Sequence, residues 1–435
     1  MEPLTVGILG MVGIIVMVLL GVRVFFAAAL VGVIGLITLK GLGVGVGISG
    51  FIPHAETAHY GLSVVPMFIL IGHLAFHAGL TQGAFQAARN WFGWLPGGVA
   101  VSTVFSAAGF AAVSGASTAT AAVFSRIAIP EMLRSGYDRK LAAGVVAAGG
   151  TLAALIPPSA ILVIYAIIVE ESVGQLLVAG FLPGILTAIA YAAVPVILVS
   201  LNPSLGRSIT GVTWGERFKS LKGVWGIFVV IAVILGGIYT GWMTPTESGA
   251  MGAFIVLLMA LAKRELSWAN LKEALIETSR LTVMIFSIIW GVMIFVRFLA
   301  FAGLPDAFAS WVVSLSYSPT MILIMILLAY VILGMFMDAI GMMLLTLPVV
   351  YPAVIALGFD PIWFGIILVK MVEMCLITPP IGLNCYVVNG MRPDIPLQDI
   401  FRGIWPFFAI DIVVVGLLIA YPEIVTFLPE MMLKN

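Results

Sequence analysis

Charged side chains are scarce in this sequence. Asp, Glu, Lys and Arg make up 9% of the 435 residues and hydrophobic residues 62%, with a mean hydropathy of +1.19. Soluble domains carry about 25% charged residues, so this composition excludes an ordinary soluble fold. Apolar runs of roughly 20 residues recur along the chain, each long enough to cross a bilayer. Because these runs lack apolar/polar alternation, they predict an all-α polytopic membrane protein rather than membrane-spanning strands.

Residues that build catalytic and metal sites are scarce as well. The two cysteines, Cys375 and Cys385, lie in apolar surroundings, and neither a disulfide framework nor a zinc-ligand pattern is expected. His73 and His77 stand four apart and could share a metal ion, but no third ligand and no HExxH pattern accompanies them. No GxxxxGK[ST] loop occurs, which argues against a pump driven by its own ATP hydrolysis. We expect no enzymatic activity, no catalytic residue and no organic cofactor.

One stretch of the sequence occurs twice. At a constant offset, five residues of the first copy match five of the second: Pro130, Gly136, Asp138, Pro157 and Pro158 correspond to Pro352, Gly358, Asp360, Pro379 and Pro380. Proline and glycine bend or end helices, so matches of these residues in one register mean more than matches of Leu or Val. Two copies of a Pro-broken apolar unit are typical of secondary transporters.

Each copy is predicted to contain a hairpin followed by a broken helix. The hairpins are expected at about 97–133 and 319–357, and the broken helices at about 139–170 and 361–390. The remaining spans are expected at about 4–22, 24–40, 63–82, 175–201, 223–241, 247–262, 282–303 and 404–428. The first run has no basic residue before it and no small-residue cleavage site, so we expect a retained helix rather than a signal peptide.

The basic residues are unevenly distributed between the two membrane faces. The positive-inside rule makes the richer face cytoplasmic and places both termini in the periplasm. The residues on the cytoplasmic face are Arg23, Arg89, Arg126, Arg134, Arg139, Lys140, Arg207, Arg217, Lys219, Lys222, Lys263, Arg264, Lys272, Arg280, Arg392 and Arg402. An odd number of expected spans separates the hairpins, so the second copy is expected to be inverted. Arginines cluster at the base of the first hairpin, whereas Asp306 and Asp360 lie at the base of the second.

The expected organisation alternates scaffold and transport segments. It comprises scaffold helices in 1–62, the first transport-domain repeat in 63–174, scaffold helices with cytoplasmic interfacial segments in 175–281, the second transport-domain repeat in 282–403, and a C-terminal helix in 404–435. The polar segments 202–222 and 263–280 are the ones expected at the cytoplasmic surface. For 202–222 a plain solvated loop is an equal alternative.

The breaks in the two helices are the first candidate sites for chemistry. A double proline removes two backbone donors and blocks helix carbonyls one turn earlier. In a membrane such breaks persist only where they line a cavity or bind something. The freed carbonyls suit a cation, and the N–H groups of the restarting helix suit a carboxylate. A single Pro-Pro pair is consistent with a simple kink, but two pairs at matching positions favour binding sites.

The hairpin turns are the second candidate sites. The turn at 114–120 consists of small and hydroxyl residues, which offer oxygen ligands for Na⁺. Ordinary packing of small residues is the alternative. In the second copy the turn contains Asp338, a costly carboxylate in apolar surroundings that is expected to bind an ion or to lock the hairpin tip. Lys370 and Glu373, three residues apart, form either a structural ion pair or part of the second site.

Taken together, these segments resemble the large membrane subunit of TRAP transporters, the tripartite ATP-independent periplasmic transporters of organic acids. The resemblance covers essentially the whole chain and is most specific at 114–122, 149–159, 334–348 and 373–384. It implies an inverted-repeat elevator transporter fold with two re-entrant hairpins, driven by Na⁺. It also implies two partners, a separate small four-helix membrane subunit and a periplasmic substrate-binding protein. Met374-Cys375 departs from the pattern, because a small residue, usually Gly, is expected before the Leu-Ile-Thr-Pro-Pro run.

These arguments define three candidate sites, with Na⁺ as the only metal ion expected. The first Na⁺ site comprises Ser114, Gly115, Ser117, Thr118, Gly150, Thr151 and Pro157. The second comprises Gly334, Asp338, Gly341, Glu373, Thr378 and Pro379. The substrate site comprises Ser117, Thr120, Pro158, Ser159, Pro380, Gly382 and Asn384.

The function expected is Na⁺-coupled import of an organic acid across the bacterial inner membrane. The substrate is a C4-dicarboxylate, sialic acid or a similar carboxylate, delivered by the binding protein. The alternative within transport is a stand-alone Na⁺/dicarboxylate carrier without a binding protein. An intramembrane hydrolase using Ser114 or Asp338 lacks a catalytic partner, and crossed hairpins fit alternating access better than an open channel.

Overall fold

The computed structural model describes residues 2–337 and 339–434, which contain helices and connecting loops and no strand. The first half of the chain forms α1 (Pro3–Leu19), α2 (Val24–Lys40), α3 (Leu42–Thr57), α4 (Val64–His77), α5 (Leu80–Phe92), α6 (Gly98–Ser114), α7 (Ser117–Arg134), α8 (Arg139–Thr151), α9 (Ala160–Ile168), α10 (Val173–Ala179) and α11 (Phe181–Leu201). The second half forms α12 (Trp214–Ser220), α13 (Trp225–Tyr239), α14 (Pro245–Ala262), α15 (Trp268–Ala302), α16 (Leu304–Ser314), α17 (Pro319–Gly334), α18 (Ala339–Ala356), α19 (Pro361–Ile377), α20 (Leu383–Met391), α21 (Leu397–Ala420) and α22 (Glu423–Lys434).

Several of these helices are long and apolar enough to cross a membrane. Within the described residues there are 6, or up to 7 if the bent pair Trp214–Gly223 and Trp225–Tyr239 forms one span. The first legs of the two hairpins, α6 and α17, are shorter, with 17 and 16 residues. The protein is therefore a multi-pass helical membrane protein, as the composition predicts.

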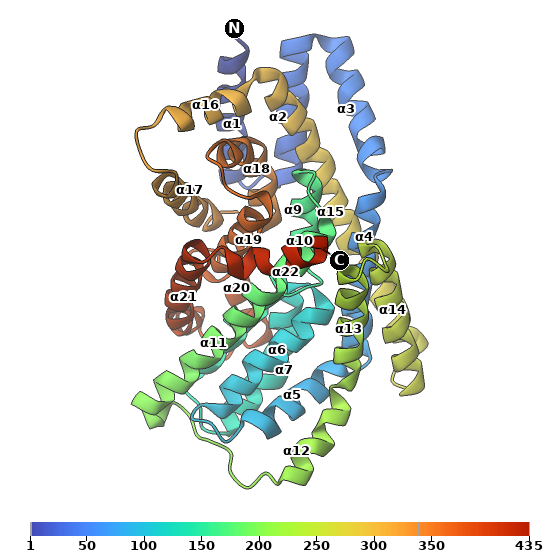
Figure 1. Ribbon diagram of the computed structural model, residues 1–435, viewed down its shortest axis with the longest axis vertical. Helices are drawn as coiled ribbons and strands as arrows, with labels where there is room; N and C mark the ends of the chain where they lie inside the picture. The colour runs from blue at the N-terminus through green and yellow to red at the C-terminus, as the bar shows by residue number, and fades with distance from the viewer. Residues whose placement is uncertain (1, 338, 435) are drawn as a thin grey trace.

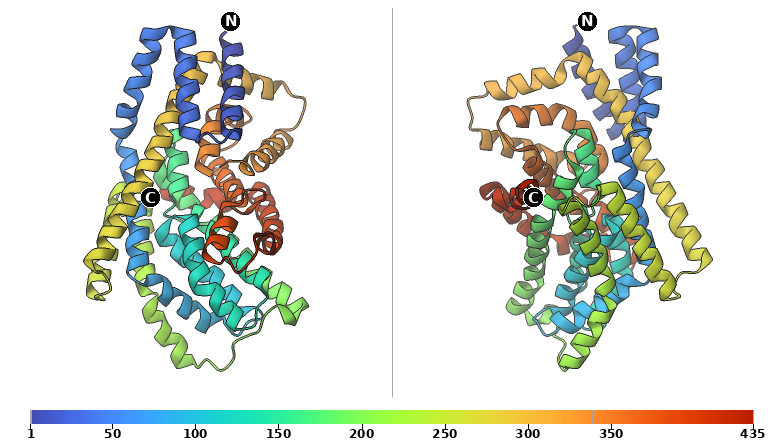
Figure 2. Two further views of the ribbon diagram at one scale, coloured as in Figure 1. Left: turned by 180° about the vertical axis from the view of Figure 1, so that it is seen from behind. Right: turned by 45° about the vertical axis from the view of Figure 1, so that its right-hand side comes forward.

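The molecule is elongated, and its two hairpins lie in different halves (Figure 1). The α6–α7 hairpin occupies the lower half with α5, and the α17–α18 hairpin occupies the upper half below α16. The long helix α15 runs beside α2 and α4 along one side, and this side comes forward in the right-hand view of Figure 2. The broken helices contact both hairpins: α8 packs on α6 and α7 and α9 on α18, while α19 packs on α17 and α18 and α20 on α7.

Repeated residues occupy equivalent places in the two copies. Gly136 (φ +79°) and Gly358 (φ +86°) follow the second leg of each hairpin, where a left-handed backbone favours glycine. Asp138 and Asp360 then cap α8 and α19, each accepting a hydrogen bond from a backbone N–H of the first turn. The matching sequence thus encodes one helix–turn–helix unit twice.

Buried apolar side chains form two separate clusters. The smaller cluster joins α5 to α8 with α11, α20 and α21, and Phe124, Tyr191 and Phe407 are among its largest members. The larger cluster includes α1 to α4, α9, α13 to α15 and the second hairpin with α19. The two broken helices contribute to both clusters, so they connect the two halves of the protein.

Helix α3 is absent from the sequence expectation. Its sequence contains four glycines, which have low helix propensity, and the segment does not read as a span. In the structure Gly45 lies directly against α2, where a Cβ atom would stand 2.7 Å from the Ile37 nitrogen. Close packing on α2 therefore stabilises a helix that local propensity does not favour. Helix α3 runs from the upper end of α2 down to α4 (Figure 1).

A second difference concerns the segment at 263–280. The sequence predicts a separate interfacial segment there, followed by a span at 282–303. Instead α15 is one continuous helix of 35 residues that begins at Trp268, behind the N-cap Ser267, whose side chain accepts a hydrogen bond from the Asn270 N–H. Its first turns remain largely exposed, including Lys272, Glu273 and Arg280, and only the face that carries Ala274 and Thr278 is buried.

Candidate functional site: the hairpin tips and the helix breaks

The tip of the first hairpin lies against the break in the first copy. Gly115 joins α6 to α7 with φ +58°, and a Cβ atom there would stand 2.6 Å from the Pro158 carbonyl oxygen. Only glycine permits this approach, because a side chain would collide with backbone. Residues 152–159 of the break are all buried. The structure thus brings the turn of the first hairpin against the first helix break, and the two meet at Gly115 and Pro158.

Hydroxyl groups surround this tip. Ser114 Oγ lies 3.1 Å from Thr120 Oγ1, and Thr120 Oγ1 also donates to the Ala116 carbonyl at 2.9 Å. At the break, Ser159 caps α9 by accepting from the Leu162 N–H at 3.3 Å, and its hydroxyl donates to the Ala154 carbonyl. These hydrogen bonds stabilise the backbone of the turn and of the break. They also place hydroxyl and carbonyl oxygens close together at the hairpin tip.

Asn384, from the second copy, completes the first site. Its Nδ2 donates to Ser117 Oγ at 2.9 Å and to the Ala147 carbonyl at 3.1 Å, and its side chain is fully buried. Gly150 lies between these groups, with the Ser117 carbonyl 3.1 Å from where its Cβ would be. The sequence assigns Asn384 to the substrate site, and the structure adds that it ties α20 to the first hairpin.

Two further residues of the predicted first site are oriented differently. The hydroxyl of Thr151 donates to the Ala148 carbonyl at 2.7 Å and lies 3.3 Å from the Tyr191 hydroxyl. It therefore faces α11 as well as the break. Thr118 is half-buried in the first turn of α7, and Pro157 is buried in the break.

The second predicted site lies where the second hairpin meets α19. Gly334 ends α17 against α19, where a Cβ atom would stand 1.9 Å from Cys375 Sγ. Thr378 Oγ1 donates to the Met374 carbonyl at 2.5 Å, and Gly341 is buried in α18. Asp338 lies outside the described residues. The expected small residue before the Leu-Ile-Thr-Pro-Pro run is thus replaced by a cysteine that packs on the hairpin.

The second break is more open than the first. Pro379 is half-buried, Pro380 and Ile381 are exposed, and Gly382 begins α20 with φ +50°. Of the remaining predicted substrate residues, Pro380 therefore lies at an accessible surface, whereas Gly382 is buried like Asn384.

A fully buried ionic cluster connects α19, α21 and α11. Lys370 Nζ lies 2.7 Å from Glu373 Oε2 and 2.7 Å from Asp411 Oδ1, and all three side chains have 0% exposure. Tyr191 donates to Asp411 Oδ2 at 2.7 Å and contacts Thr151. The predicted Lys370–Glu373 ion pair is confirmed. Two carboxylates share one ammonium. Removing the ammonium would leave buried charges without a partner and would destabilise the folded protein.

Sequence reasoning missed Asp411 and Tyr191. Asp411 is a lone carboxylate in the apolar run that becomes α21, and an ionisable residue within a span is a signal of function or pairing. Its partner Lys370 is distant in sequence, so the pairing itself is visible only in the folded protein.

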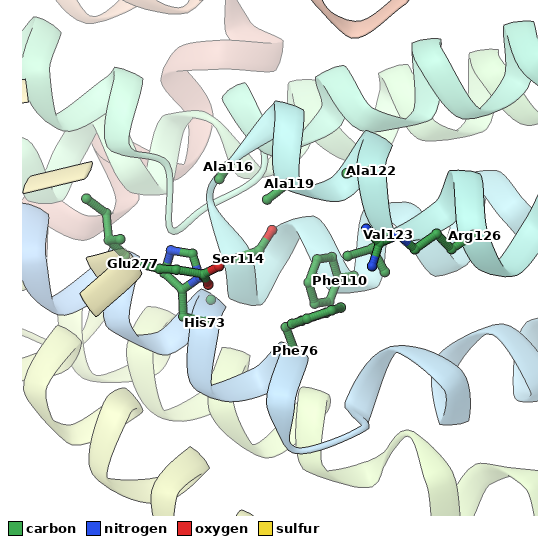
Figure 3. A pocket seen from close by; sticks show the side chains of 12 residues that line it. His73, Phe76, Phe110, Ser114, Ala116, Ala119, Ala122, Val123, Arg126 and Glu277 are labelled. Atoms are coloured by element: carbon green, nitrogen blue, oxygen red, sulfur yellow. The ribbon is translucent and has the colours of Figure 1, made fainter. Parts of the chain in front are cut away.

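One pocket lies beside the first hairpin tip, between α4, α6, α7 and α15. It has a volume of about 230 Å³ and is lined by Ile69, Gly72, His73, Phe76, Phe110, Ser114, Ala116, Ala119, Ala122, Val123, Arg126 and Glu277. Figure 3 shows His73 and Glu277 at one end, Arg126 at the other, and Phe76 and Phe110 between them. Gly72 sets the width, because a Cβ atom there would stand 2.7 Å from the Ser114 carbonyl oxygen.

Comparison with known proteins decides the family. Residues 10–424 match the family described as "Tripartite ATP-independent periplasmic transporter, DctM component". The chain belongs to this family of TRAP transporter large permease subunits. The resemblance found in the sequence is thereby confirmed across nearly the whole chain.

The TRAP relatives carry different solutes according to their names. The chain is 36% identical to the C4-dicarboxylate TRAP transporter large permease protein DctM of Pseudomonas aeruginosa, with 86% of each chain covered. It is 30% identical to the sialic acid TRAP transporter large permease protein SiaM of Vibrio cholerae, covering 86% of this chain and 87% of that one. The fold is similar to that of the Alcanivorax borkumensis YdaH transporter, with a TM-score of 0.56, 15% identity and coverage of 84% and 86%.

Proposed function

We propose that this chain is the membrane-spanning carrier of a Na⁺-coupled TRAP system that imports an organic acid across the bacterial inner membrane. The observation that carries the proposal is the meeting of the first hairpin tip, the first helix break and Asn384 of the second copy. Membrane helices keep such irregular backbone only where it is buried or lines a cavity. Both copies thus contribute to one site, as in transporters built from repeats.

We propose that the two hairpins are re-entrant and that the copies are inverted. Their first legs, with 17 and 16 residues, are about as short as a span can be. The hairpins lie in opposite halves of the molecule (Figure 1). Basic residues cluster at the base of the first and not of the second, which supports entry from the cytoplasm and from the periplasm, respectively. Both termini are then periplasmic.

We assign Na⁺ to the hairpin tips as the coupling ion. At the first site, hydroxyl and carbonyl oxygens gather around Gly115, Ser117 and Gly150, and hard cations prefer oxygen ligands. At the second site, Thr378 and the carbonyls freed by Pro379 and Pro380 are the corresponding groups. Glu373 is paired with Lys370, so we do not assign it as a direct Na⁺ ligand. It influences the second Na⁺ site through the electrostatic field of the buried ionic cluster. The substrate carboxylate then meets the N-terminus of α9 or α20.

The transport step is proposed to be an elevator movement of the hairpins and broken helices against a scaffold. The buried Tyr191–Asp411–Lys370 network ties α11 and α21 to α8 and α19, so we place α11 and α21 in the moving unit. Helix α4 packs on α14 and α15, and α15 packs on α2, so we place these helices in the scaffold. This boundary differs from the sequence expectation, which assigns 175–281 to the scaffold and 63–82 and 282–303 to the repeats.

The proposed partners are a small membrane subunit docked on the scaffold and a periplasmic substrate-binding protein that delivers the acid. Uptake by the purified chain in proteoliposomes tests this, with each partner present or omitted. We expect uptake only when all components are present. Robust uptake by the chain alone identifies instead a stand-alone Na⁺/dicarboxylate carrier, and absence of uptake of every organic acid under all conditions contradicts both.

A further inference from the structure

We propose that the pocket between α4, α15 and the first hairpin binds a small organic anion that carries a hydrogen-bond donor at its far end. The inference rests on the proposed transport of an organic acid and narrows the substrate class. It places a binding position on the scaffold side of the hairpin tip, outside the helix breaks. The argument uses the two polar ends of the pocket and the apolar wall between them (Figure 3).

Arg126 supplies the anion-binding end. Two neighbouring arginines are paired: Arg89 lies 2.9 Å from Glu131, and Arg139 lies 2.7 Å from Asp399. Arg126 lines the pocket with an exposed side chain, and within residues 2–337 and 339–434 it has neither an ion pair nor a hydrogen bond. A guanidinium presents a fork of N–H donors that matches the two oxygens of a carboxylate. The unpaired fork therefore favours a carboxylate or a similar oxyanion.

The opposite end is rich in acceptors. Glu277 Oε2 accepts a hydrogen bond of 2.8 Å from His73 Nδ1, and His77 Nε2 lies 4.0 Å from the same oxygen. With Nδ1 donating, the neutral His73 ring presents Nε2 as an acceptor. The Glu277 side chain is 39% exposed, so its carboxylate is accessible from the pocket. A hydroxyl or ammonium group of a ligand fits this end, whereas a second carboxylate would face the negative charge of Glu277.

The wall between the two ends is apolar. Phe76, Phe110 and Val123 line it together with small alanines, and a solute with many hydroxyls would lose hydrogen bonds to water here without replacement. The volume of about 230 Å³ suits a small molecule with a short methylene chain. The pocket therefore selects an anion with an apolar body and one donor group, in preference to a dicarboxylate or a sugar acid.

A matched set of ligands tests this preference directly. Binding to the purified chain in nanodiscs is measured by isothermal titration calorimetry with 4-hydroxybutanoate, 4-aminobutanoate, pentanoate and glutarate. These probes share a carboxylate and three methylenes and differ at the far end, which is a hydroxyl, an ammonium, a methyl or a second carboxylate. We expect the hydroxyl and ammonium probes to bind about tenfold more tightly than pentanoate, and glutarate to bind most weakly.

Two variants assign the ends of the pocket. Arg126→Gln is expected to weaken binding of every probe by about tenfold or more, because the charge-assisted contact is lost. Arg134→Gln, an exposed arginine two turns further along α7, is the matched control and should leave binding unchanged. Glu277→Gln is expected to abolish the discrimination against glutarate and the preference for 4-aminobutanoate.

The outcomes separate this inference from the proposed function. Equal or tighter binding of glutarate, no binding of any probe, or an Arg126→Gln variant that binds like the unaltered protein overturns the pocket assignment. Uptake assays are independent of it: binding in the predicted order without uptake of any acid leaves the pocket in place and contradicts the transport function. If the protein transports the four probes at rates that do not follow the predicted order of binding, the pocket assignment is overturned and the transport function stands.

Discussion

Asn384 donates a hydrogen bond of 2.9 Å to Ser117 Oγ, although the two residues belong to different copies of the repeat. Ser117 begins the second leg of the first hairpin, and Asn384 lies in the first turn of the helix that restarts after Pro379-Pro380. Because the pair is buried, the hairpin and the second broken helix cannot separate without breaking it. The two copies are thus joined at the proposed ion and substrate site.

Ser117→Ala and Thr378→Ala each remove one hydroxyl oxygen from a proposed Na⁺ site. The apparent Na⁺ affinity of uptake should fall by roughly tenfold in each, on the scale of one lost polar contact, while membrane insertion is retained. The Na⁺ concentration dependence of initial uptake rates measures the change. Ser125→Ala is the matched control, since its hydroxyl also lies on α7 but donates only to the Ala121 carbonyl of its own helix. An unchanged Na⁺ dependence of uptake in both site variants would contradict the assignment of Na⁺ to these two sites.

The buried ionic cluster predicts an asymmetry between two substitutions. Lys370→Met leaves two buried carboxylates without a cation and should destabilise the protein strongly, by about 3–5 kcal/mol. Asp411→Asn leaves the Lys370–Glu373 pair intact and retains an acceptor for Tyr191, so we expect a loss of about 1–2 kcal/mol. Thermal unfolding of the purified variants in one detergent gives the order. A Lys370→Met variant as stable as Asp411→Asn contradicts the charge argument.

Topology is tested by accessibility of single cysteines. Ser208 lies in an exposed loop expected on the cytoplasmic face, and Ala356 is exposed at the end of α18, near Asp360. In spheroplasts a membrane-impermeant maleimide should label Ala356→Cys and should not label Ser208→Cys until the membrane is permeabilised. Labelling of Ser208→Cys in intact spheroplasts is incompatible with the inverted arrangement.

A cross-link across the pocket tests the elevator movement. Phe76 on α4 and Phe110 on α6 line the same pocket, and α4 belongs to the proposed scaffold while α6 belongs to the moving unit (Figure 3). In a background with the buried Cys375 and Cys385 replaced by Ala, a bismaleimide joining Phe76→Cys and Phe110→Cys should stop uptake. Binding-protein docking should persist. Normal uptake by the cross-linked protein excludes movement between these helices.

Much of the fold was predictable because the signals are local. Proline and glycine at fixed spacings mark the hairpins and breaks, and the observed hairpins, Gly98–Arg134 and 319–356, lie within a residue or two of the predicted ones. The contact of Gly115 with Pro158 follows the same signals, because both residues sit at interruptions of helical backbone.

What could not be predicted depends on contacts between distant segments. Helix α3 contains four glycines and is stabilised by close packing on α2, which no local propensity reveals. The Asp411–Lys370 pair and the Asn384–Ser117 bond join residues from separate helices. The pocket is formed by side chains of α4, α15 and the first hairpin, so neither its polar ends nor its size follow from any one motif.

The central claim is that a Na⁺ gradient drives this chain to carry an organic acid inward. The most direct measurement is the initial rate of uptake of a radiolabelled organic acid into proteoliposomes that contain the chain and the small subunit, with the binding protein outside. The account predicts accumulation under an inward Na⁺ gradient and none when K⁺ replaces Na⁺ at the same membrane potential. Equal accumulation in K⁺ would contradict it.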